Sequence, residues 1–235
     1  MRNRLFILLM IAIICSLSIP FLLYNGYICF NYPSPQEFPI QGIDISHHQG
    51  EIDWKELEKE NISFIFIKAT EGGNFKDPKF KENWDHAKSS KYAVGAYHFY
   101  SLCKTGIEQA DNFIASVPKE PGSLPPVIDL EFGGNCKTEK SKDQVIKEIQ
   151  DYIDKIKDHY GEFPIIYVTT DFYDIYLINN FKECPVWIRD IYSKPKLPDN
   201  REWLFWQYAN RGHLSGIKGF VDLNVYKGKR IKLRK

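Results

Sequence analysis

The chain has 235 residues, of which 43% are hydrophobic and 26% are charged, a composition typical of a globular protein with one sizeable core. Its 31 basic and 30 acidic residues nearly cancel, and no basic stripe runs along the sequence, which argues against nucleic acid as a partner. Aromatic residues make up 15% of the chain, and Trp and Tyr can serve as core or as platforms for flat, amphipathic ligands.

The first predicted element is an apolar segment at the N-terminus. Arg2 and Arg4 precede residues 5–24, which carry no charge and are long enough to span a bilayer. A cleaved signal peptide has a shorter apolar region and a small-residue cleavage site, and no clear Ala-x-Ala pattern follows here. With the positive charge inside, the rest of the chain lies outside the cytoplasm. We therefore expect residues 1–30 to anchor the protein in the cell envelope, with a cleaved signal and secretion as the alternative.

After a Pro-rich spacer at residues 31–40, residues 41–235 alternate between strand and helix patterns and are expected to form one domain. This alternation predicts a parallel α/β sheet, and the number of strands predicts a TIM-like (β/α) barrel with few helices in its second half. The helices expected are 53–60, 78–90, 106–117, 143–160 and 172–178, the first with Asp53 as its N-cap. The strands expected are 42–46, 64–69, 92–100, 126–131, 164–169, 186–188, 204–208 and 221–224.

Polar or aromatic residues occur late in every predicted strand, where (β/α) barrels place their active sites. Asp129 and Glu131 are the most informative of them, because residues two apart on a strand point to the same face. A pair of carboxyl groups can protonate the leaving oxygen and stabilise the positive charge on the sugar ring, which is what glycoside hydrolysis requires. The other residues at strand ends are Asp44, Lys68, Glu71, Tyr97, His98, Tyr167, Trp187, Arg189, Asp190, Trp206, Gln207, Tyr208, Asp222 and Asn224.

Six short segments together resemble glycoside hydrolase family 25, the Chalaropsis-type lysozymes or N-acetylmuramidases. They are Gly-Ile-Asp-Ile-Ser at 42–46, Lys-Ala-Thr-Glu-Gly at 68–72, Gly-Ala-Tyr-His-Phe at 95–99, Asp-Leu-Glu at 129–131, Trp-Gln-Tyr at 206–208 and Val-Asp-Leu-Asn at 221–224. The resemblance implies a modified (β/α) barrel that hydrolyses peptidoglycan at the β-1,4 bond between N-acetylmuramic acid and N-acetylglucosamine. It also implies no metal and no cofactor.

The same resemblance assigns roles to single residues. Glu131 matches the general acid of the family, and Asp129 matches its partner carboxylate, whereas Asp44 and Asp222 match two further acids of the site. Four carboxylates in one pocket would raise the pKa of at least one of them, so that it can donate a proton near neutral pH. Whether Asp129 acts as a nucleophile or steers the N-acetyl oxygen of the substrate stays open, and both routes retain configuration. Arg189 departs from the family pattern, in which we would expect a small residue at this position.

Several residues keep a plainer alternative. We expect five aromatic residues to contact the sugar, with barrel packing as the alternative for each: Tyr97, Tyr167, Trp187, Trp206 and Tyr208. His98 is expected to be structural, and Lys68 and Glu71 could simply pair with each other. His47 and His48 are not expected to bind metal, because neighbours on a strand point to opposite faces.

The sequence also predicts one disulfide and the partners of the protein. Cys103 and Cys136 follow strand ends and are expected to form a disulfide, with free thiols as the alternative. The protein is expected to be a monomer that acts on peptidoglycan and contacts the membrane through its N-terminal segment. Two alternative functions are a chitinase-like hydrolase of N-acetylglucosamine polymers and a non-catalytic module that binds cell walls.

Overall fold

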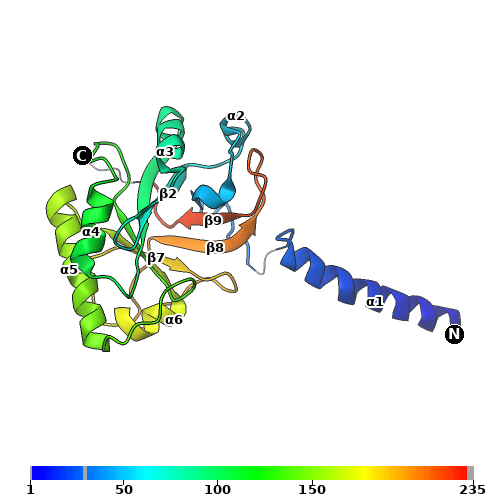
Figure 1. Ribbon diagram of the computed structural model, residues 1–235. Coiled ribbons are helices and arrows are strands. Elements are labelled where there is room, and N and C mark those ends of the chain that lie inside the picture. The colour runs from blue at the N-terminus through cyan, green and yellow to red at the C-terminus, as the bar shows by residue number, and fades with distance from the viewer. Residues whose placement is uncertain (1, 29–30, 232–235) are drawn as a thin grey trace.

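The computed structural model describes residues 2–28 and 31–231 (Figure 1). Within these residues nine strands form one sheet in the order β1-β9-β8-β7-β6-β5-β4-β2-β3, and an additional pairing of β1 with β2 closes it. Eight strands therefore form a barrel, and β3 is a short antiparallel extension on β2. The predicted barrel is confirmed. The strands are β1 (Ile40–Ile45), β2 (Phe64–Glu71), β3 (Phe75–Lys76), β4 (Ala93–Phe99), β5 (Val127–Leu130), β6 (Ile165–Thr169), β7 (Val186–Arg189), β8 (Phe205–Gly212) and β9 (Val221–Tyr226).

One strand departs from the expected parallel sheet. The neighbours from β1 through β2 and β4 to β8 pair in parallel, whereas β9 pairs antiparallel with both β8 and β1. The reason is the connection at 213–220, which is too short for the crossover that a parallel strand needs. The start of β9 therefore lies at the barrel end where the parallel strands finish.

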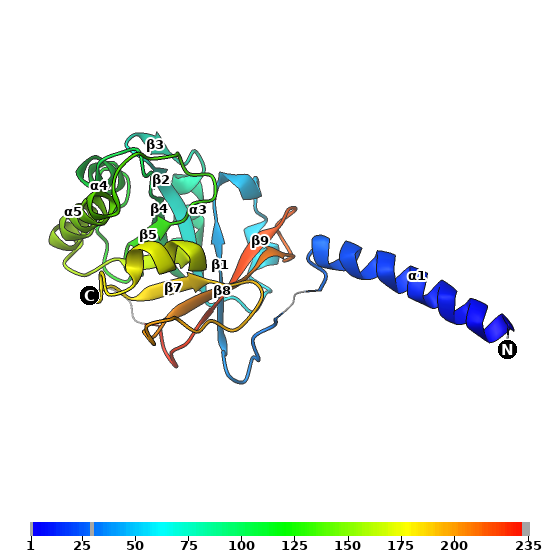
Figure 2. The ribbon, with the colours of Figure 1, turned by 90° about the horizontal axis from the view of Figure 1, so that it is seen from below.

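The helices are distributed unevenly around the barrel, as the sequence predicts. Helices α4 and α5 lie side by side against one side of it, and no helix stands between β7 and β8 or between β8 and β9 in the described chain (Figures 1 and 2). The expected cap is present, since Asp53 Oδ1 accepts hydrogen bonds from the backbone N–H groups of Lys55 and Glu56. The helices are α1 (Arg2–Tyr24), α2 (Trp54–Leu57), α3 (Phe80–Ser89), α4 (Gly106–Ile114), α5 (Lys142–Tyr160) and α6 (Thr170–Phe172), with a 3-10 turn at His47–Gln49 and a π turn at Tyr173–Leu177.

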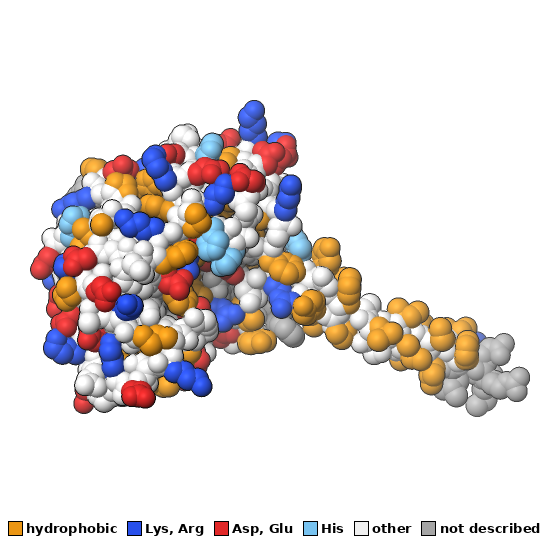
Figure 3. Space-filling view, in the orientation of Figure 1, with side chains coloured by type: hydrophobic (Ala, Val, Ile, Leu, Met, Phe, Trp, Pro, Cys, Tyr) orange, Lys and Arg blue, Asp and Glu red, His pale blue; other side chains and the backbone are white. Residues whose placement is uncertain are grey.

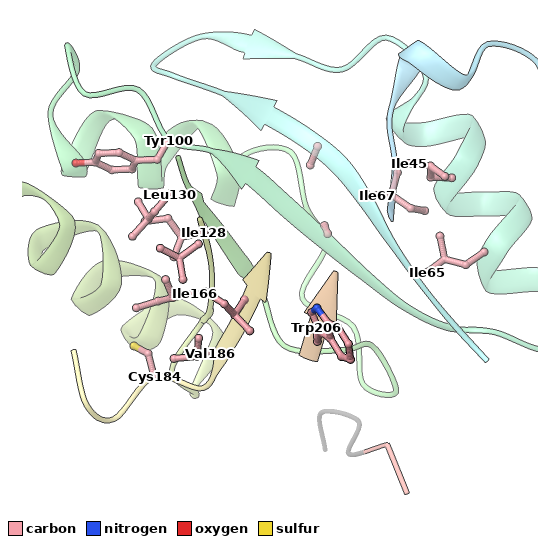
Figure 4. Close-up of a cluster of buried hydrophobic side chains, with 14 of the residues drawn as sticks. Ile45, Ile65, Ile67, Tyr100, Ile128, Leu130, Ile166, Cys184, Val186 and Trp206 are labelled. Carbon is pink, nitrogen blue, oxygen red and sulfur yellow. The ribbon is translucent and has the colours of Figure 1, made fainter. Parts of the chain in front are cut away.

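Strand alternation divides the side chains into an outer and an inner core. On β5, Ile128 and Leu130 belong to the outer cluster between sheet and helices, part of which Figure 4 shows. Val127 belongs to the inner cluster, and Asp129 shares its face of the strand. The barrel interior is thus filled by an aromatic floor, above which the acidic residues stand. The inner cluster comprises Phe64, Phe66, Leu124, Val127, Ile165, Tyr167, Trp187, Phe205 and Tyr226.

Two further features lie outside the barrel. The disulfide joins Cys103 to Cys136 and ties the loop after β4 to the loop after β5, as expected. Helix α1 projects away from the domain with its apolar side chains exposed (Figures 1 and 3). Its segment Phe6–Tyr24 is long and apolar enough to cross a membrane, although a signal sequence near an N-terminus has the same properties.

Candidate active site

A cavity of about 480 Å³ opens at the end of the barrel where the parallel strands finish. All four predicted acids line it: Asp44 from β1, Asp129 from β5, Glu131 just after β5, and Asp222 from the start of β9. Asp44 and Asp222 lie opposite each other in the register of β1 and β9. The antiparallel direction of β9 explains why a residue at the beginning of a strand joins residues from the ends of others.

Asp44 and Asp222 form a hydrogen-bonded pair of carboxyl groups. Burial raises the pKa of Asp44, while the side-chain amides of Asn224 and Gln207 oppose that rise by donating to its Oδ2 atom at 2.7 Å and 3.0 Å. Burial and the charge of Asp44 hold the pKa of Asp222 well above its usual range. The two buried carboxyl groups therefore favour sharing one proton over ionising together.

Each of these two amides is oriented by an aromatic side chain. The hydroxyl of Tyr167 donates to Gln207 Oε1 at 3.0 Å, and the indole N–H of Trp187 donates to Asn224 Oδ1 at 2.8 Å. Because each amide oxygen accepts a hydrogen bond, each amide nitrogen must face Asp44. The sequence marked Gln207 and Asn224 only as residues at strand ends, and it carried no signal for this orienting role.

Asp129 and Glu131 form the second acidic pair. Burial raises the pKa of Asp129 well above its usual range, and the charges of Glu131 and Asp44 raise it further, against the opposing charge of Lys68. The Oδ1 atom of Asp129 is buried and has no hydrogen-bond partner among the described residues. Burial also raises the pKa of Glu131, although the charge of Arg189 lowers it. Both carboxyl groups can therefore hold a proton at pH values above those at which carboxyl groups normally ionise.

The predicted aromatic contacts fall into two groups. Tyr97, Tyr167 and Trp187 line the cavity. Trp206 and Tyr208 do not line it, which corrects the expectation that they contact the sugar. They flank Gln207 on β8, and because Gln207 faces the barrel interior, both neighbours face outward into the outer core.

Among the basic and imidazole side chains near the site, some have structural roles. Lys68 Nζ and Glu71 Oε2 form the alternative ion pair at 2.7 Å, and both residues also line the cavity. His98 is buried, donates to Gln109 at 3.2 Å and accepts from Thr70 at 2.7 Å, and burial lowers its pKa to about 3. It is therefore a neutral structural residue, as expected.

The expected placement of His47 and His48 on a strand is wrong. They lie in a 3-10 turn instead of a strand, and their ring centroids are only 4.0 Å apart. His47 Nδ1 bonds to Asp77 Oδ2 at 2.7 Å, whereas His48 lines the cavity. Within residues 2–28 and 31–231, no group of three or more His, Cys, Asp or Glu side chains is arranged to hold a metal ion.

A second hollow of about 490 Å³ adjoins the cavity. Glu131 and Gly133 line both spaces, so Glu131 stands at their junction. The other residues around the second hollow come from the ends of β6 and β7 and the loops that follow them: Thr169, Thr170, Asp171, Arg189, Asp190, Ile191, Tyr192 and Ser193.

Comparisons with known proteins agree with this geometry. The sequence model for glycosyl hydrolases family 25 matches residues 43–217. Lysozyme M1 from Streptomyces globisporus is 32% identical over 206 residues, covering 83% of this chain and 70% of that protein. The uncharacterized protein YegX from Escherichia coli K12 is 35% identical over 199 residues, covering 83% and 72%. A solved family 25 glycosyl hydrolase from Bacillus anthracis aligns with a TM-score of 0.80 and 42% identity, covering 86% and 94%.

Proposed function

Because the chain belongs to glycosyl hydrolase family 25 and is therefore a glycoside hydrolase, we propose that it is a retaining N-acetylmuramidase. The bond it cleaves is the β-1,4 link between N-acetylmuramic acid and N-acetylglucosamine in peptidoglycan. The observation that carries the proposal is the convergence of four carboxyl groups on one cavity, with Glu131 at its junction with a second hollow. A glycan that fills both spaces would place a sugar–sugar link at Glu131.

Glu131 is the general acid in this proposal. Its burial raises its pKa, so the carboxyl group can keep its proton and deliver it to the glycosidic oxygen as the bond breaks. The half-buried side chain still lines both hollows and is accessible to substrate from each. Such proton donation contributes about 10²- to 10⁴-fold in rate.

Asp129 stabilises the positive charge that develops on the sugar ring. It does so as a nucleophile or by directing the N-acetyl oxygen of the substrate onto the anomeric carbon. Asp129 lines the cavity, and its Oδ1 atom accepts no hydrogen bond from the described residues, which supports either role. Asp44 and Asp222 act through it, because their negative charge raises the pKa of Asp129 and the protons they hold set how strong that effect is.

The arrangement of the chain supports an extracytoplasmic enzyme of the cell envelope. We place the hydrolase domain at residues 41–235, the spacer at 31–40 and the anchor or signal at 1–30, which contains the apolar helix α1. The peptidoglycan substrate lies outside the cytoplasm, and an N-terminal apolar segment is what either export or anchoring requires.

The proposal is tested with Glu131→Gln, which keeps the shape of the side chain and removes its proton. Release of muramic acid reducing ends from purified peptidoglycan should fall by about 10²- to 10⁴-fold, with the thermal midpoint preserved. Glu139→Gln, an exposed substitution in the loop after β5, should leave the rate unchanged. Near-normal lysis by Glu131→Gln would reject the acid assignment, and reducing ends from chitin alone would reject the substrate.

A further inference from the structure

Arg189 is a cation beside the proposed acid. It ends β7, is half-buried and lines the second hollow together with Glu131. The described part of the chain offers its guanidinium no hydrogen bond or ion pair, although its charge reaches Glu131, Asp44 and Asp222. A guanidinium group has five N–H donors in a planar fork, and the residue that carries it here lines the hollow.

Thr169 provides a second unused donor in the same place. It stands opposite Arg189 in the register of β6 and β7, and it also lines the second hollow. Its side-chain Oγ1 atom is buried and has no hydrogen-bond partner among residues 2–28 and 31–231, and Thr169 as a whole is only 9% exposed. Buried hydroxyl groups are normally hydrogen-bonded, so this hydroxyl, on the strand position paired with Arg189, leaves hydrogen-bonding capacity at the hollow that the described residues do not use.

Besides Glu131, two carboxylates that follow β6 and β7 line this space, and both accept hydrogen bonds from their own segments. Both oxygens of Asp190 accept hydrogen bonds from its own loop, from the backbone of Tyr192 and Ser193 and from the Ser193 hydroxyl. Asp171 accepts from the backbone N–H of Phe172 through Oδ1. Neither of these two acids forms an ion pair with Arg189 in the described chain, so its guanidinium is available to an acceptor from outside.

We propose that Arg189 and Thr169 form a carboxylate-binding subsite that selects acidic glycans. A planar carboxylate matches the guanidinium fork in a bidentate pair, and a neighbouring hydroxyl can donate to the same group. This inference rests on the proposed function, because muramic acid carries a lactyl carboxyl group, either free or linked to a peptide that has carboxylates of its own. Polymers of N-acetylglucosamine carry none.

The test compares Arg189→Gln with the parent full-length chain in detergent on three substrates. They are peptide-free wall glycan with free lactyl carboxylates, intact peptide-bearing walls, and neutral N-acetylglucosamine oligosaccharides. The kcat/KM value should fall by about 10- to 100-fold on a carboxylate-bearing substrate, the scale of lost charge-assisted hydrogen bonds, and much less on the neutral one. A loss confined to peptide-free glycan identifies the lactyl group, and a loss confined to intact walls identifies the peptide. Equal losses on all three substrates overturn the proposal.

Binding gives a readout that does not depend on which bond is cleaved. In a Glu131→Gln background, the affinity for peptide-free wall glycan relative to the neutral oligosaccharide should drop on Arg189→Gln. The Glu131→Gln background removes the effect of Arg189 on the pKa of Glu131, and the ratio cancels any effect that applies equally to every glycan. An unchanged ratio refutes the subsite, whereas product analysis of the parent enzyme separately tests the proposed function.

Three further variants sharpen the assignment. Arg189→Lys keeps the charge without the fork and should recover only part of the affinity for wall glycan. Thr169→Val should weaken that affinity while the thermal midpoint stays the same or rises, since the lost hydroxyl has no partner to leave unsatisfied. Lys196→Gln removes an exposed charge from the same loop, outside the hollow, and should leave the ratio unchanged.

Discussion

Carboxyl groups that keep their protons set the electrostatics of the cavity. Burial is the main cause of the raised pKa of Asp129, Glu131 and Asp222, and each also lies near other acids. The unfolded chain would ionise these groups near their ordinary range. The folded protein thus binds more protons over the pH window between the ordinary and the raised values, and its stability falls as pH rises through that window.

Asp129→Asn tests this cost directly. At pH 7 the substitution should raise the stability by about 1–2 kcal/mol, the scale often gained by relieving a strained functional site. That corresponds to roughly 2–8 °C in the thermal midpoint for a domain of this size. The gain should shrink as pH falls through the raised pKa and should vanish below about 4, where the carboxyl group becomes protonated in the unfolded state as well. Differential scanning calorimetry across this range measures it, with peptidoglycan hydrolysis falling in the same variant.

A surface substitution provides the matched control. Asp174→Asn changes an exposed carboxyl group, and at every pH its thermal midpoint should be nearly equal to that of the parent protein. If Asp129→Asn lowered stability at pH 7, the carboxylate would be stabilising in the fold, and the desolvation argument would be wrong.

The acids themselves were predictable at the residue scale, but their orientation was not. Asp129 and Glu131 stood out because alternation on a strand follows from sequence alone. Gln207 and Asn224 take their roles from Tyr167 and Trp187, which lie far away in the chain. Such amide orientations depend on tertiary partners and leave no local pattern.

At the scale of elements, strand direction and strand parity decide which side chains reach the cavity. The sequence predicted the eight barrel strands, because each is a short apolar run with turn residues beside it. It missed β3, which spans only Phe75–Lys76 and has no alternation to read. It also missed the reversal of β9 and the outward parity of Trp206 and Tyr208, since both depend on how strands pair.

Gly95 on β4 shows how close the packing beneath the cavity is. It pairs in register with Phe66 on β2, and an added Cβ would lie 2.6 Å from the Phe66 ring and 2.9 Å from Leu124 Cβ. The Phe66 ring stacks on Trp187 with centroids 4.7 Å apart, and Trp187 lines the cavity. The absence of a side chain at Gly95 thus makes room for the aromatic floor that supports the site.

Gly95→Ala should therefore destabilise the protein and disturb catalysis together. Overpacking of this kind costs about 1–3 kcal/mol, which urea unfolding would detect. Displacement of Phe66 should shift Trp187, so kcat/KM on peptidoglycan should fall in the folded variant. Gly219→Ala is the control, because an added Cβ there meets no atom within 4 Å. Equal stability of the two variants would show that the floor can adjust without cost.

For the whole molecule, the question is how the apolar helix relates to the barrel. The guanidinium of Arg211 donates to the backbone carbonyl of Tyr24 and lies 4.2 Å from the centroid of the Tyr24 ring. A ring nitrogen of His213 lies 2.6 Å from the carbonyl oxygen of Asn25, and the His213 ring stacks on Tyr27. These hydrogen bonds are exposed, and the Phe6–Tyr24 segment buries none of its length against the domain.

A chain that starts at residue 31 should therefore fold like the full-length protein. Its thermal midpoint should change by no more than about 2 °C, because exposed contacts of this kind contribute within about 0.5 kcal/mol. Hydrolysis of purified peptidoglycan should persist, since the cavity and the second hollow are built from residues after position 40. Association with lipid vesicles should be lost, because the apolar helix provides the membrane-spanning length.

Arg211→Ala in the full-length chain is the control, because it removes the contact of Arg211 with Tyr24 and keeps the helix. This variant should retain both its stability and its association with vesicles. Aggregation of the shortened chain, or a fall of its midpoint well beyond that of Arg211→Ala, would mean that the N-terminal segment belongs to the folded domain.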